Sequence, residues 1–405
     1  MTVIVNKSTA NGEIYAPPSK SYAHRMMICS ALSDGKSIIK GISDSEDMKA
    51  TLDCIKALGA TYKIDGGVCE ITGNHPCIGN GKVTHKFMCR ESGSTLRFII
   101  PIALVYYAES EFYGTEKLIS RGISVYEQIC TEQGIICEKH DSYIRLCGKL
   151  HGGVFNVRGD ISSQFISGLM FALPLCKEDS VINITTAFES YGYALITADV
   201  LKKFGICVEV TEKTVKIKGN QTYKCGNFMV EGDMSNGAFL DAFNVIGGDV
   251  SVKGLDFDTY QPDKTYRKYF DVLKNGTPTL DVSSCPDLAP VLMALMAVKN
   301  GGRLIGTRRL KIKESDRGAA MAYELCKIGS FCDVLENEIV IRKTEKYPTS
   351  VVFDSHNDHR IVMALSVIST LFGARITGAE TVKKSYPEFF GDISKLGIGT
   401  EYEIR

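Results

Sequence analysis

The sequence lacks several features that would assign it to a specialised class of protein. Its 405 residues include no Trp and only 11 Pro, and 47 basic side chains balance 47 acidic ones. A net charge of zero gives no basic surface for nucleic acid or an anionic membrane. No apolar run approaches the ~18–20 residues that span a bilayer, and the first residues do not have the pattern of a signal peptide. We therefore expect a cytosolic protein with no nucleic-acid or membrane partner.

Cysteine pairs of the C-x-x-C kind are also missing. The 14 cysteines are scattered singly, and most lie inside apolar stretches such as Met27-Ile28-Cys29-Ser30-Ala31. This pattern indicates free thiols packed as small hydrophobic side chains rather than a disulfide framework or a metal site. We expect no metal ion and no cofactor.

An internal repeat organises the chain. Six helix-like segments end in a Gly, with an apolar residue four positions earlier, as expected of a helix that packs one face and stops at a glycine cap. The pairs are Ile55 and Gly59, Cys130 and Gly134, Leu201 and Gly205, Val272 and Gly276, Leu325 and Gly329, and Ile393 and Gly397. The spacing predicts six copies of about 70 residues, each with two helices and about four strands.

A second series of six helix-like segments is apolar on nearly every side, which predicts buried helices. They open at Ser19-Lys20-Ser21, Ser92-Gly93-Ser94, Ser162-Ser163-Gln164, Asp233-Met234-Ser235, Cys285-Pro286-Asp287 and Asp358-His359-Arg360. A helix N-terminus binds anions, although ordinary N-capping also explains the hydroxyls and Asp. Capping does not explain the cations near these starts, because they oppose the helix dipole.

Three polar stretches carry candidate chemistry. In Pro18-Ser19-Lys20-Ser21-Tyr22-Ala23-His24-Arg25, the helical spacing puts Ser21 and Arg25 on one face, where a phosphate or carboxylate could bind. In 308–317, Lys311 and Lys313 are expected on one strand face, followed by Glu314 and a helix capped by Ser315. Asn357-Asp358-His359-Arg360 opens the third helix. The alternatives are a solvated basic turn, a surface ion-pair cluster and a packed histidine, respectively. Together with Arg97, Arg121 and Lys384, the three stretches predict a cationic site in a neutral protein.

These stretches, in this order from Pro17 to Pro387, resemble the 5-enolpyruvylshikimate-3-phosphate synthases (3-phosphoshikimate 1-carboxyvinyltransferases) of the enolpyruvyl transferase family. The resemblance implies an α/β fold of six βαβαββ units, an inside-out α/β barrel, with three units per domain. It implies an inserted domain at 19–230, mainly on the shikimate 3-phosphate side, and a second domain of 1–18 and 231–405. The active site is expected in the cleft between them.

The implied reaction transfers the enolpyruvyl group of phosphoenolpyruvate to the 5-hydroxyl of shikimate 3-phosphate. Phosphate leaves by addition and elimination through a tetrahedral intermediate, a step toward chorismate and the aromatic amino acids. These two small molecules are the expected partners, and we expect a monomer. The resemblance implies Asp287 as the base for the 5-hydroxyl proton, and Glu314 assisted by Lys20 for the proton at C3.

The resemblance also implies the binding residues. For shikimate 3-phosphate they are Lys20, Ser21, Arg25, Ser162, Ser163, Gln164, Ser190, Tyr193, Asp287 and Lys313. For phosphoenolpyruvate they are Lys20, Gly93, Arg121, Gln164, Arg317, Arg360 and Lys384. Gly93 is the small residue of glyphosate-sensitive members, so we expect glyphosate to compete with phosphoenolpyruvate. Glu91 and Arg309 depart from the family pattern, which has Asn at both positions in many or some members.

Two other functions agree less well with the sequence. UDP-N-acetylglucosamine enolpyruvyl transferases share the fold, but their reactive Cys is absent from Gly114-Thr115-Glu116-Lys117-Leu118-Ile119-Ser120. An RNA-end-processing protein built on the same unit would need a basic stripe, which the charge balance does not supply.

Overall fold

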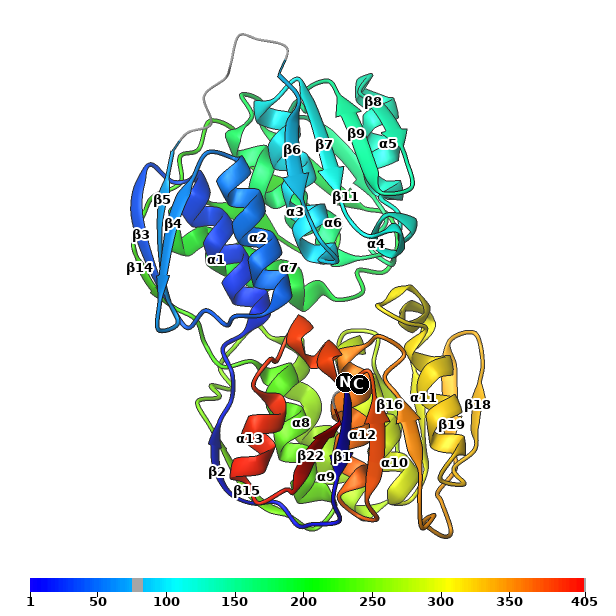
Figure 1. Cartoon of the computed structure of the whole chain (residues 1–405). Helices are drawn as coiled ribbons and strands as arrows, with labels where there is room; N and C mark the ends of the chain where they lie inside the picture. Colours follow the sequence, from blue (N-terminus) through cyan, green and yellow to red (C-terminus); the bar gives the residue numbers. More distant parts are fainter. Residues whose placement is uncertain (75–82, 404–405) are drawn as a thin grey trace. The chain divides into compact units, whose positions relative to one another are not determined.

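The computed structural model describes residues 1–74 and 83–403 (Figure 1). The chain forms two compact units: unit 1 comprises Met1–Pro17 and Gly232–Arg405, and unit 2 comprises Pro18–Glu231. Within unit 2 the Ser19 amide donates to the Glu231 carbonyl at 2.7 Å, and within unit 1 the Asp233 amide donates to the Pro17 carbonyl at 2.8 Å. In each unit, one of these bonds joins the two segments at which the chain passes from one unit to the other.

Unit 2 contains three four-stranded sheets with one common pattern. In each sheet the first two strands are parallel and the remaining neighbours are antiparallel. Their orders are β14-β3-β5-β4, β6-β7-β9-β8 and β10-β11-β13-β12. The strands are β3 (Gly35–Lys40), β4 (Thr61–Asp65), β5 (Val68–Gly73), β6 (His85–Met88), β7 (Glu109–Tyr113), β8 (Ile136–Lys139), β9 (Tyr143–Cys147), β10 (Val154–Val157), β11 (Ser180–Ile184), β12 (Val208–Val210), β13 (Thr214–Ile217) and β14 (Asn227–Met229). The parallel pair needs a helical crossover, which is why each sheet comes with helices.

Unit 1 repeats this pattern twice and shortens it once. The complete sheets are β16-β17-β19-β18 and β20-β21-β1-β22. In the second sheet, the N-terminal strand β1 lies between β21 and β22. In the third, β15 pairs in parallel with β2 alone among the described residues. The strands are β1 (Thr2–Val5), β2 (Asn11–Tyr15), β15 (Asp249–Lys253), β16 (Thr279–Asp281), β17 (Gly302–Ile305), β18 (Cys332–Val334), β19 (Glu338–Ile341), β20 (Val352–Asp354), β21 (Ala374–Thr377) and β22 (Thr400–Glu403).

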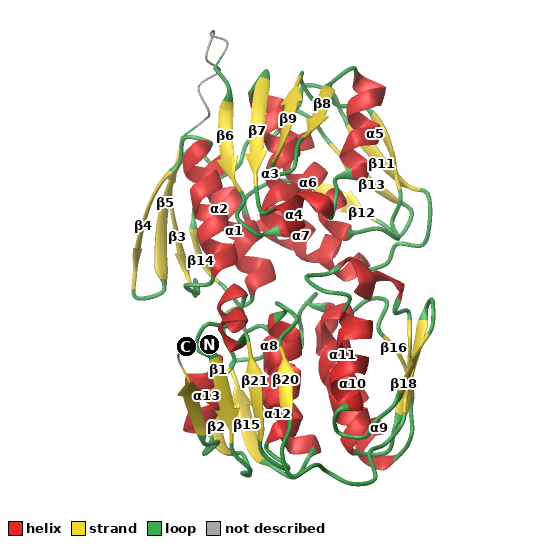
Figure 2. Cartoon of the chain, turned by 45° about the vertical axis from the view of Figure 1, so that its right-hand side comes forward, coloured by secondary structure: helices red, strands yellow, loops and turns green. Residues whose placement is uncertain are grey.

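Each unit has its own apolar core, built around three almost fully buried helices. In unit 2 these are α1 (Lys20–Leu32), α3 (Gly93–Tyr106) and α6 (Ser163–Ala172), and in unit 1 they are α8 (Met234–Val245), α10 (Ala289–Val298) and α12 (His359–Ser369). Figure 2 shows the sheets of each unit arranged around its helices. The helix starts agree with the predicted openings, except that a 3-10 turn, η3 (Pro286–Leu288), precedes α10.

The helices of the second series are only partly buried. They are α2 (Glu46–Ala57), α5 (Ser124–Gln133), α7 (Tyr191–Lys203), α9 (Tyr266–Asn275), α11 (Arg317–Cys326) and α13 (Phe389–Lys395). Five of the six predicted terminal glycines have the left-handed φ that favours Gly, from 68° at Gly134 to 101° at Gly59. The fourth prediction is right about where the helix ends, because Gly276 is the cap of α9, but wrong about the packed residue, because Val272 is 48% exposed. Leu273 takes the buried place instead. Gly276 is extended, at φ −172°, and is not left-handed.

Two local predictions in the stretch 308–317 are also wrong. Lys311 lies in a 3-10 helix, η4 (Arg308–Ile312), so it does not share a strand face with Lys313. The helix that follows is capped by Asp316, whose carboxylate accepts from the Ala319 amide at 3.2 Å, and not by Ser315. Asp is at least as good an N-cap as Ser and stands one residue closer to the first helical position.

Further short elements are α4 (Glu116–Ser120), η1 (Leu173–Leu175), η2 (Pro262–Thr265) and η5 (Ala379–Lys384). Within the described residues, no helix combines the length and apolar character that a membrane span requires.

Candidate active site

Lys20 begins the cluster of polar side chains in unit 2. Its ammonium contacts the Asp47 carboxylate of α2 at 2.8 Å, and both side chains are largely buried. Asp47 was not among the predicted residues, since nothing in the sequence links two positions 27 residues apart. An anionic substrate that approaches Lys20 must therefore compete with this carboxylate.

Arg25 turns inward from the same helix. Its guanidinium donates to the Thr197 hydroxyl at 2.8 Å, to the carbonyls of Ser21 at 2.7 Å and Tyr193 at 3.2 Å, and to the Ser167 hydroxyl at 3.3 Å. It is 3% exposed, and burial lowers its pKa to about 10. All four acceptors are neutral, so the charge of Arg25 is solvated by dipoles and lacks a carboxylate among these partners.

Arg97 joins the starts of two buried helices. Its guanidinium donates to the Gln164 side-chain oxygen at 2.8 Å, and more weakly to the carbonyls of Gly93 at 3.4 Å and Gly122 at 3.3 Å. Arg121 reaches the same place, because a Cβ built on Gly93 would lie 2.9 Å from an Arg97 nitrogen and 3.2 Å from an Arg121 nitrogen. Two guanidinium groups therefore flank the first residue of α3.

The hydroxyl groups predicted for the phosphate stand at two further helix starts. Ser162 caps α6 and accepts from the Gln164 amide at 3.3 Å, and Ser163 follows it at the first helical position. Ser190 caps α7 in the left-handed conformation, at φ 58°, and is buried. Tyr193, three residues later, is half-buried and offers its carbonyl to Arg25.

A buried hydrogen-bond chain ties α1, α2 and α3 together beneath these groups. His24 Nδ1 lies 2.6 Å from the Thr51 hydroxyl, which lies 2.8 Å from the Thr95 hydroxyl, and Thr95 donates to Ser92 at 2.8 Å. Burial, with help from Lys20 and Arg25, lowers the pKa of His24 well below its ordinary value. His24 is therefore a neutral, packed imidazole that supports the site.

The cluster in unit 1 is centred on Asp287, just before α10. Its carboxylate contacts Arg317 at 2.6 Å, Lys313 at 3.3 Å and Arg360 at 3.4 Å. Burial lowers the pKa of Lys313, and the Asp287 charge opposes that shift. The structure thus brings together the predicted base and three of the predicted cations.

Arg317 is the most heavily paired cation of this cluster. Besides Asp287, it contacts the carboxylates of Asp358 and Glu314 at 2.8 Å and 2.7 Å. Burial alone would lower the pKa of Arg317, but its carboxylate partners outweigh burial and raise that pKa well above its ordinary value. Arg317 therefore stays charged and holds Glu314 in a fixed position.

Arg360 and Lys384 complete the unit 1 cluster. Arg360 is 3% exposed and donates to the Asn236 side-chain oxygen at 3.1 Å, with its guanidinium 5.5 Å from the Phe239 ring centroid. Lys384 donates to the Asn357 carbonyl at 3.0 Å and to its side-chain oxygen at 3.2 Å. Asn236 was missed by the sequence reasoning, although its place in the opening turn of α8 matches that of the other site residues.

Of the two departures from the family pattern, Glu91 follows an arginine that has carboxylate partners, and Arg309 itself has a backbone partner. Arg90, the neighbour of Glu91, turns to Glu46 and Asp53 of α2, both at 2.9 Å. Arg309 is buried and donates to the Ser283 carbonyl. Both arginines therefore have partners within their own units.

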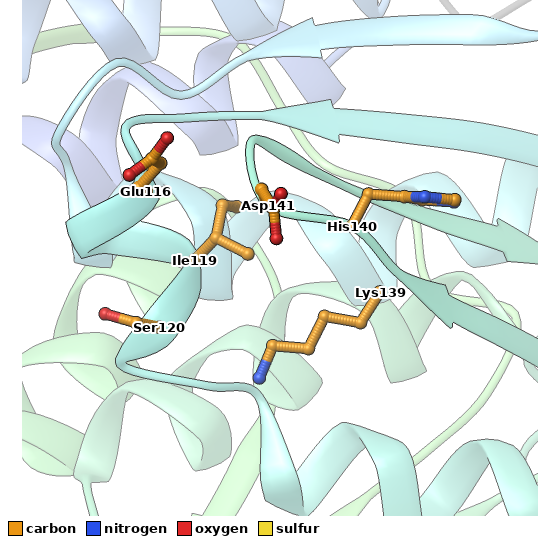
Figure 3. Close-up of a pocket in the computed structure, with 6 residues that line it drawn as sticks. All are labelled: Glu116, Ile119, Ser120, Lys139, His140 and Asp141. Carbon is orange, nitrogen blue, oxygen red and sulfur yellow. The ribbon is translucent and has the colours of Figure 1, made fainter.

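A separate hollow of about 750 Å³ lies beside α4 in unit 2. Figure 3 shows Ile119 of α4 and Asp141 of the β8–β9 turn facing each other, with Lys139 below. Its lining carries both signs of charge and includes no predicted site residue. We find no reason to place the reaction there.

Neither metal ligation nor disulfide bonding is supported by the part of the chain that the structure describes. No group of three or more His, Cys, Asp and Glu side chains could hold a metal ion there. The 13 described cysteines are free, and seven of them are buried. The sulfur atoms of Cys54 and Cys89 lie 3.9 Å apart, too far for a disulfide bond.

Two sets of Lys and Arg side chains at the starts of buried helices, one of them with paired carboxylates, define an α/β enzyme for small, multiply anionic substrates. The family model for EPSP synthase (3-phosphoshikimate 1-carboxyvinyltransferase) matches residues 4–393. The chain belongs to this family.

Similar proteins agree with this assignment. A 3-phosphoshikimate 1-carboxyvinyltransferase of Clostridium novyi (strain NT) is 42% identical over 424 residues, covering 96% of each chain. One from Clostridium acetobutylicum is 40% identical and covers 98% of this chain and 97% of its own. The solved EPSP synthase of Acinetobacter baumannii has the same fold, with a TM-score of 0.78, 21% identity and 99% coverage of both chains. The predicted fold, family and transferase activity are confirmed, and the nucleotide-sugar alternative is not favoured.

Proposed function

We propose that the two clusters divide the work of joining phosphoenolpyruvate to the 5-hydroxyl of shikimate 3-phosphate. The unit 2 cluster would take shikimate 3-phosphate through Lys20, Ser21, Arg25, Ser162, Ser163, Gln164, Ser190 and Tyr193, with Asp287 and Lys313 from unit 1. Phosphoenolpyruvate would bind Lys20, Gly93, Arg121, Gln164, Arg317, Arg360 and Lys384. Each substrate would therefore draw on residues of both units.

The observation that carries this proposal is the set of contacts around Asp287. A carboxylate held by three cations is a poor proton acceptor until those cations find other partners. The carboxylate and phosphate of phosphoenolpyruvate are such partners for Arg317 and Arg360. Substrate binding would thus free Asp287 to take the proton of the 5-hydroxyl as its oxygen attacks C2 of the enol.

Glu314 would give the proton that C3 gains in the addition step, and would take one back in the elimination. It is 25% exposed, so it can reach a substrate, and Arg317 fixes its carboxylate at 2.7 Å. Lys20 would assist Glu314 in handling the proton at C3. Such positioning and electrostatic stabilisation supply most of the rate in reactions of this kind.

The setting of the reaction is also part of the proposal. We propose that the enzyme acts as a monomer in the cytosol, without metal or cofactor. The free thiols of the described cysteines suit a reducing compartment.

The test is phosphate release from phosphoenolpyruvate, measured with shikimate 3-phosphate, with UDP-N-acetylglucosamine and with neither. We expect release only with shikimate 3-phosphate. Release only with the nucleotide sugar would overturn the assignment of the acceptor, and release with neither would overturn the proposed activity.

A further inference from the structure

A buried carboxylate outside the two clusters is built into the same helix as Arg317. Glu324 lies seven residues after Arg317 in α11, on the same face, and its side chain is 0% exposed. It accepts from the Lys327 ammonium at 2.8 Å, from His356 Nε2 at 2.8 Å and from the Asp354 amide at 3.0 Å. Because a carboxylate only accepts, the His356 ring must carry a proton on Nε2. The proposed mechanism gives Glu324 no role.

The segment that hydrogen-bonds to Glu324, from Asp354 to Asn357, has a strained backbone. His356 and Asn357 both have left-handed backbones, at φ 49° and 56°. Neither is Gly, and two such residues in a row persist only where their surroundings hold them. The His356 amide donates to the Asp354 carboxylate at 2.7 Å, and the Asn357 amide donates to the Ser355 hydroxyl at 3.2 Å. Glu324 adds the link that ties this turn to α11.

The turn leads directly to the phosphoenolpyruvate-side cations. Its Asn357 accepts two hydrogen bonds from Lys384. The next residue, Asp358, is fully buried, caps α12 through the Arg360 amide at 2.9 Å, and contacts Arg317 at 2.8 Å. Thus α11 holds this segment twice, with Arg317 at Asp358 and with Glu324 at His356.

We propose that Glu324, acting through His356, is a positioning residue that sets the places of Lys384 and Arg360. This inference rests on the proposed function, because those two cations matter only if they bind phosphoenolpyruvate. Glu324 touches neither cation, so its effect passes through the backbone of the turn. Loss of the Glu324–His356 bond would relax the turn, shift the acceptors of Lys384 and weaken the binding of phosphoenolpyruvate more than that of shikimate 3-phosphate.

The decisive variants are His356→Phe, which keeps a ring but removes the donor, and His356→Gln, which restores a donor at the same reach. His356 is partly exposed, so both should fold. We expect His356→Phe to raise KM for phosphoenolpyruvate about 3- to 10-fold, since a small misplacement of binding groups is costly. KM for shikimate 3-phosphate should stay the same, and His356→Gln should restore wild-type values. His151→Phe, at an exposed histidine in unit 2, is the matched control.

The proposal would be overturned if His356→Phe raised both KM values equally or raised neither. It would also be overturned if His356→Gln did not restore the wild-type KM for phosphoenolpyruvate. Glu324→Leu removes the acceptor and should behave as His356→Phe does. If this buried substitution prevents folding, His356→Phe is the deciding variant. A crystal structure of His356→Phe gives a readout without catalysis: loss of the Lys384–Asn357 bonds supports the proposal, and an unchanged turn refutes it. Failure of the wild-type enzyme to release phosphate would instead count against the proposed function.

Discussion

Gly93 offers the sharpest test of the phosphoenolpyruvate site, because a single methyl group reaches two guanidinium groups there. In Gly93→Ala the new Cβ would lie 2.9 Å from an Arg97 nitrogen, and 3.2 Å and 3.4 Å from the terminal nitrogen and central carbon of Arg121. Ordinary contacts begin near 3.5 Å, so the two side chains must yield by about 0.3–0.6 Å. The backbone tolerates the change, since φ of Gly93 lies outside the left-handed region.

The cost should fall on substrate binding and spare the fold. Arg97 is buried and held by Gln164 at 2.8 Å, so we expect the half-buried Arg121 to move. Ala in place of Gly in a helix gains about 0.5–1 kcal/mol, which offsets much of the crowding. A charge-assisted hydrogen bond is worth about 1.5–3 kcal/mol. Loss of half of one such bond, about 0.8–1.5 kcal/mol, raises KM for phosphoenolpyruvate about 4- to 12-fold.

The assay is steady-state phosphate release with each substrate varied in turn, with thermal unfolding alongside. We expect KM for shikimate 3-phosphate and Tm to change little. Gly391→Ala is the matched control, because Gly391 is also helical and a Cβ there meets no atom within 4 Å. An unchanged KM for phosphoenolpyruvate in Gly93→Ala would refute the reasoning. Glyphosate should inhibit the wild type in competition with phosphoenolpyruvate and inhibit Gly93→Ala less; equal inhibition of both would place glyphosate away from Gly93.

Three further predictions follow from single residues. Asp287→Asn should lower kcat by about 10²–10⁴-fold if Asp287 is the base; a loss below tenfold in steady-state assays contradicts that role. Asp316→Ala removes the cap of α11 and should cost about 1 kcal/mol of unfolding free energy in urea titrations; an unchanged midpoint contradicts the cap. The lowered pKa of His24 means that the unfolded chain binds more protons below about pH 6.5, so stability falls there as pH drops. His24→Asn should flatten that slope, by at most about 1.4 kcal/mol per pH unit, between urea titrations at about pH 7 and pH 5.5; an equal slope contradicts the burial argument.

Local patterns in the sequence predicted most of the fold. Apolar periodicity and terminal glycines identify both helix series, because each depends on residues three or four apart. The fourth repeat departs from the pattern at Gly276, which is extended, and at Val272, which is exposed. It is the repeat whose sheet is reduced to β15 and β2. With a shortened sheet, the helix no longer needs the standard turn, and nothing local in the sequence reports that.

The cationic residues of the site could be predicted from the sequence, but the side chains that accept hydrogen bonds from them could not. Lys20, Arg317 and Arg360 stand in recognisable stretches. Their acceptors Asp47 and Asn236 lie 27 and 124 residues away in sequence, so only folding brings them together. The same limit explains why the orientation of Arg25 into the protein could not be predicted from its helical position.

Charge compensation within each unit argues for the proposed division of substrates. In unit 1, Arg317 contacts three carboxylates, and Lys313 and Arg360 share one of them, Asp287, so an anion that binds these cations must exchange with Asp287. In unit 2, Arg25 is buried against neutral acceptors, and among the described residues no carboxylate hydrogen-bonds to it. A buried charge without a counter-ion is costly, and an anion bound nearby reduces that cost. This contrast supports the proposal that the permanent phosphate of shikimate 3-phosphate binds unit 2, and that the exchangeable ion pairs of unit 1 bind the substrate whose phosphate departs.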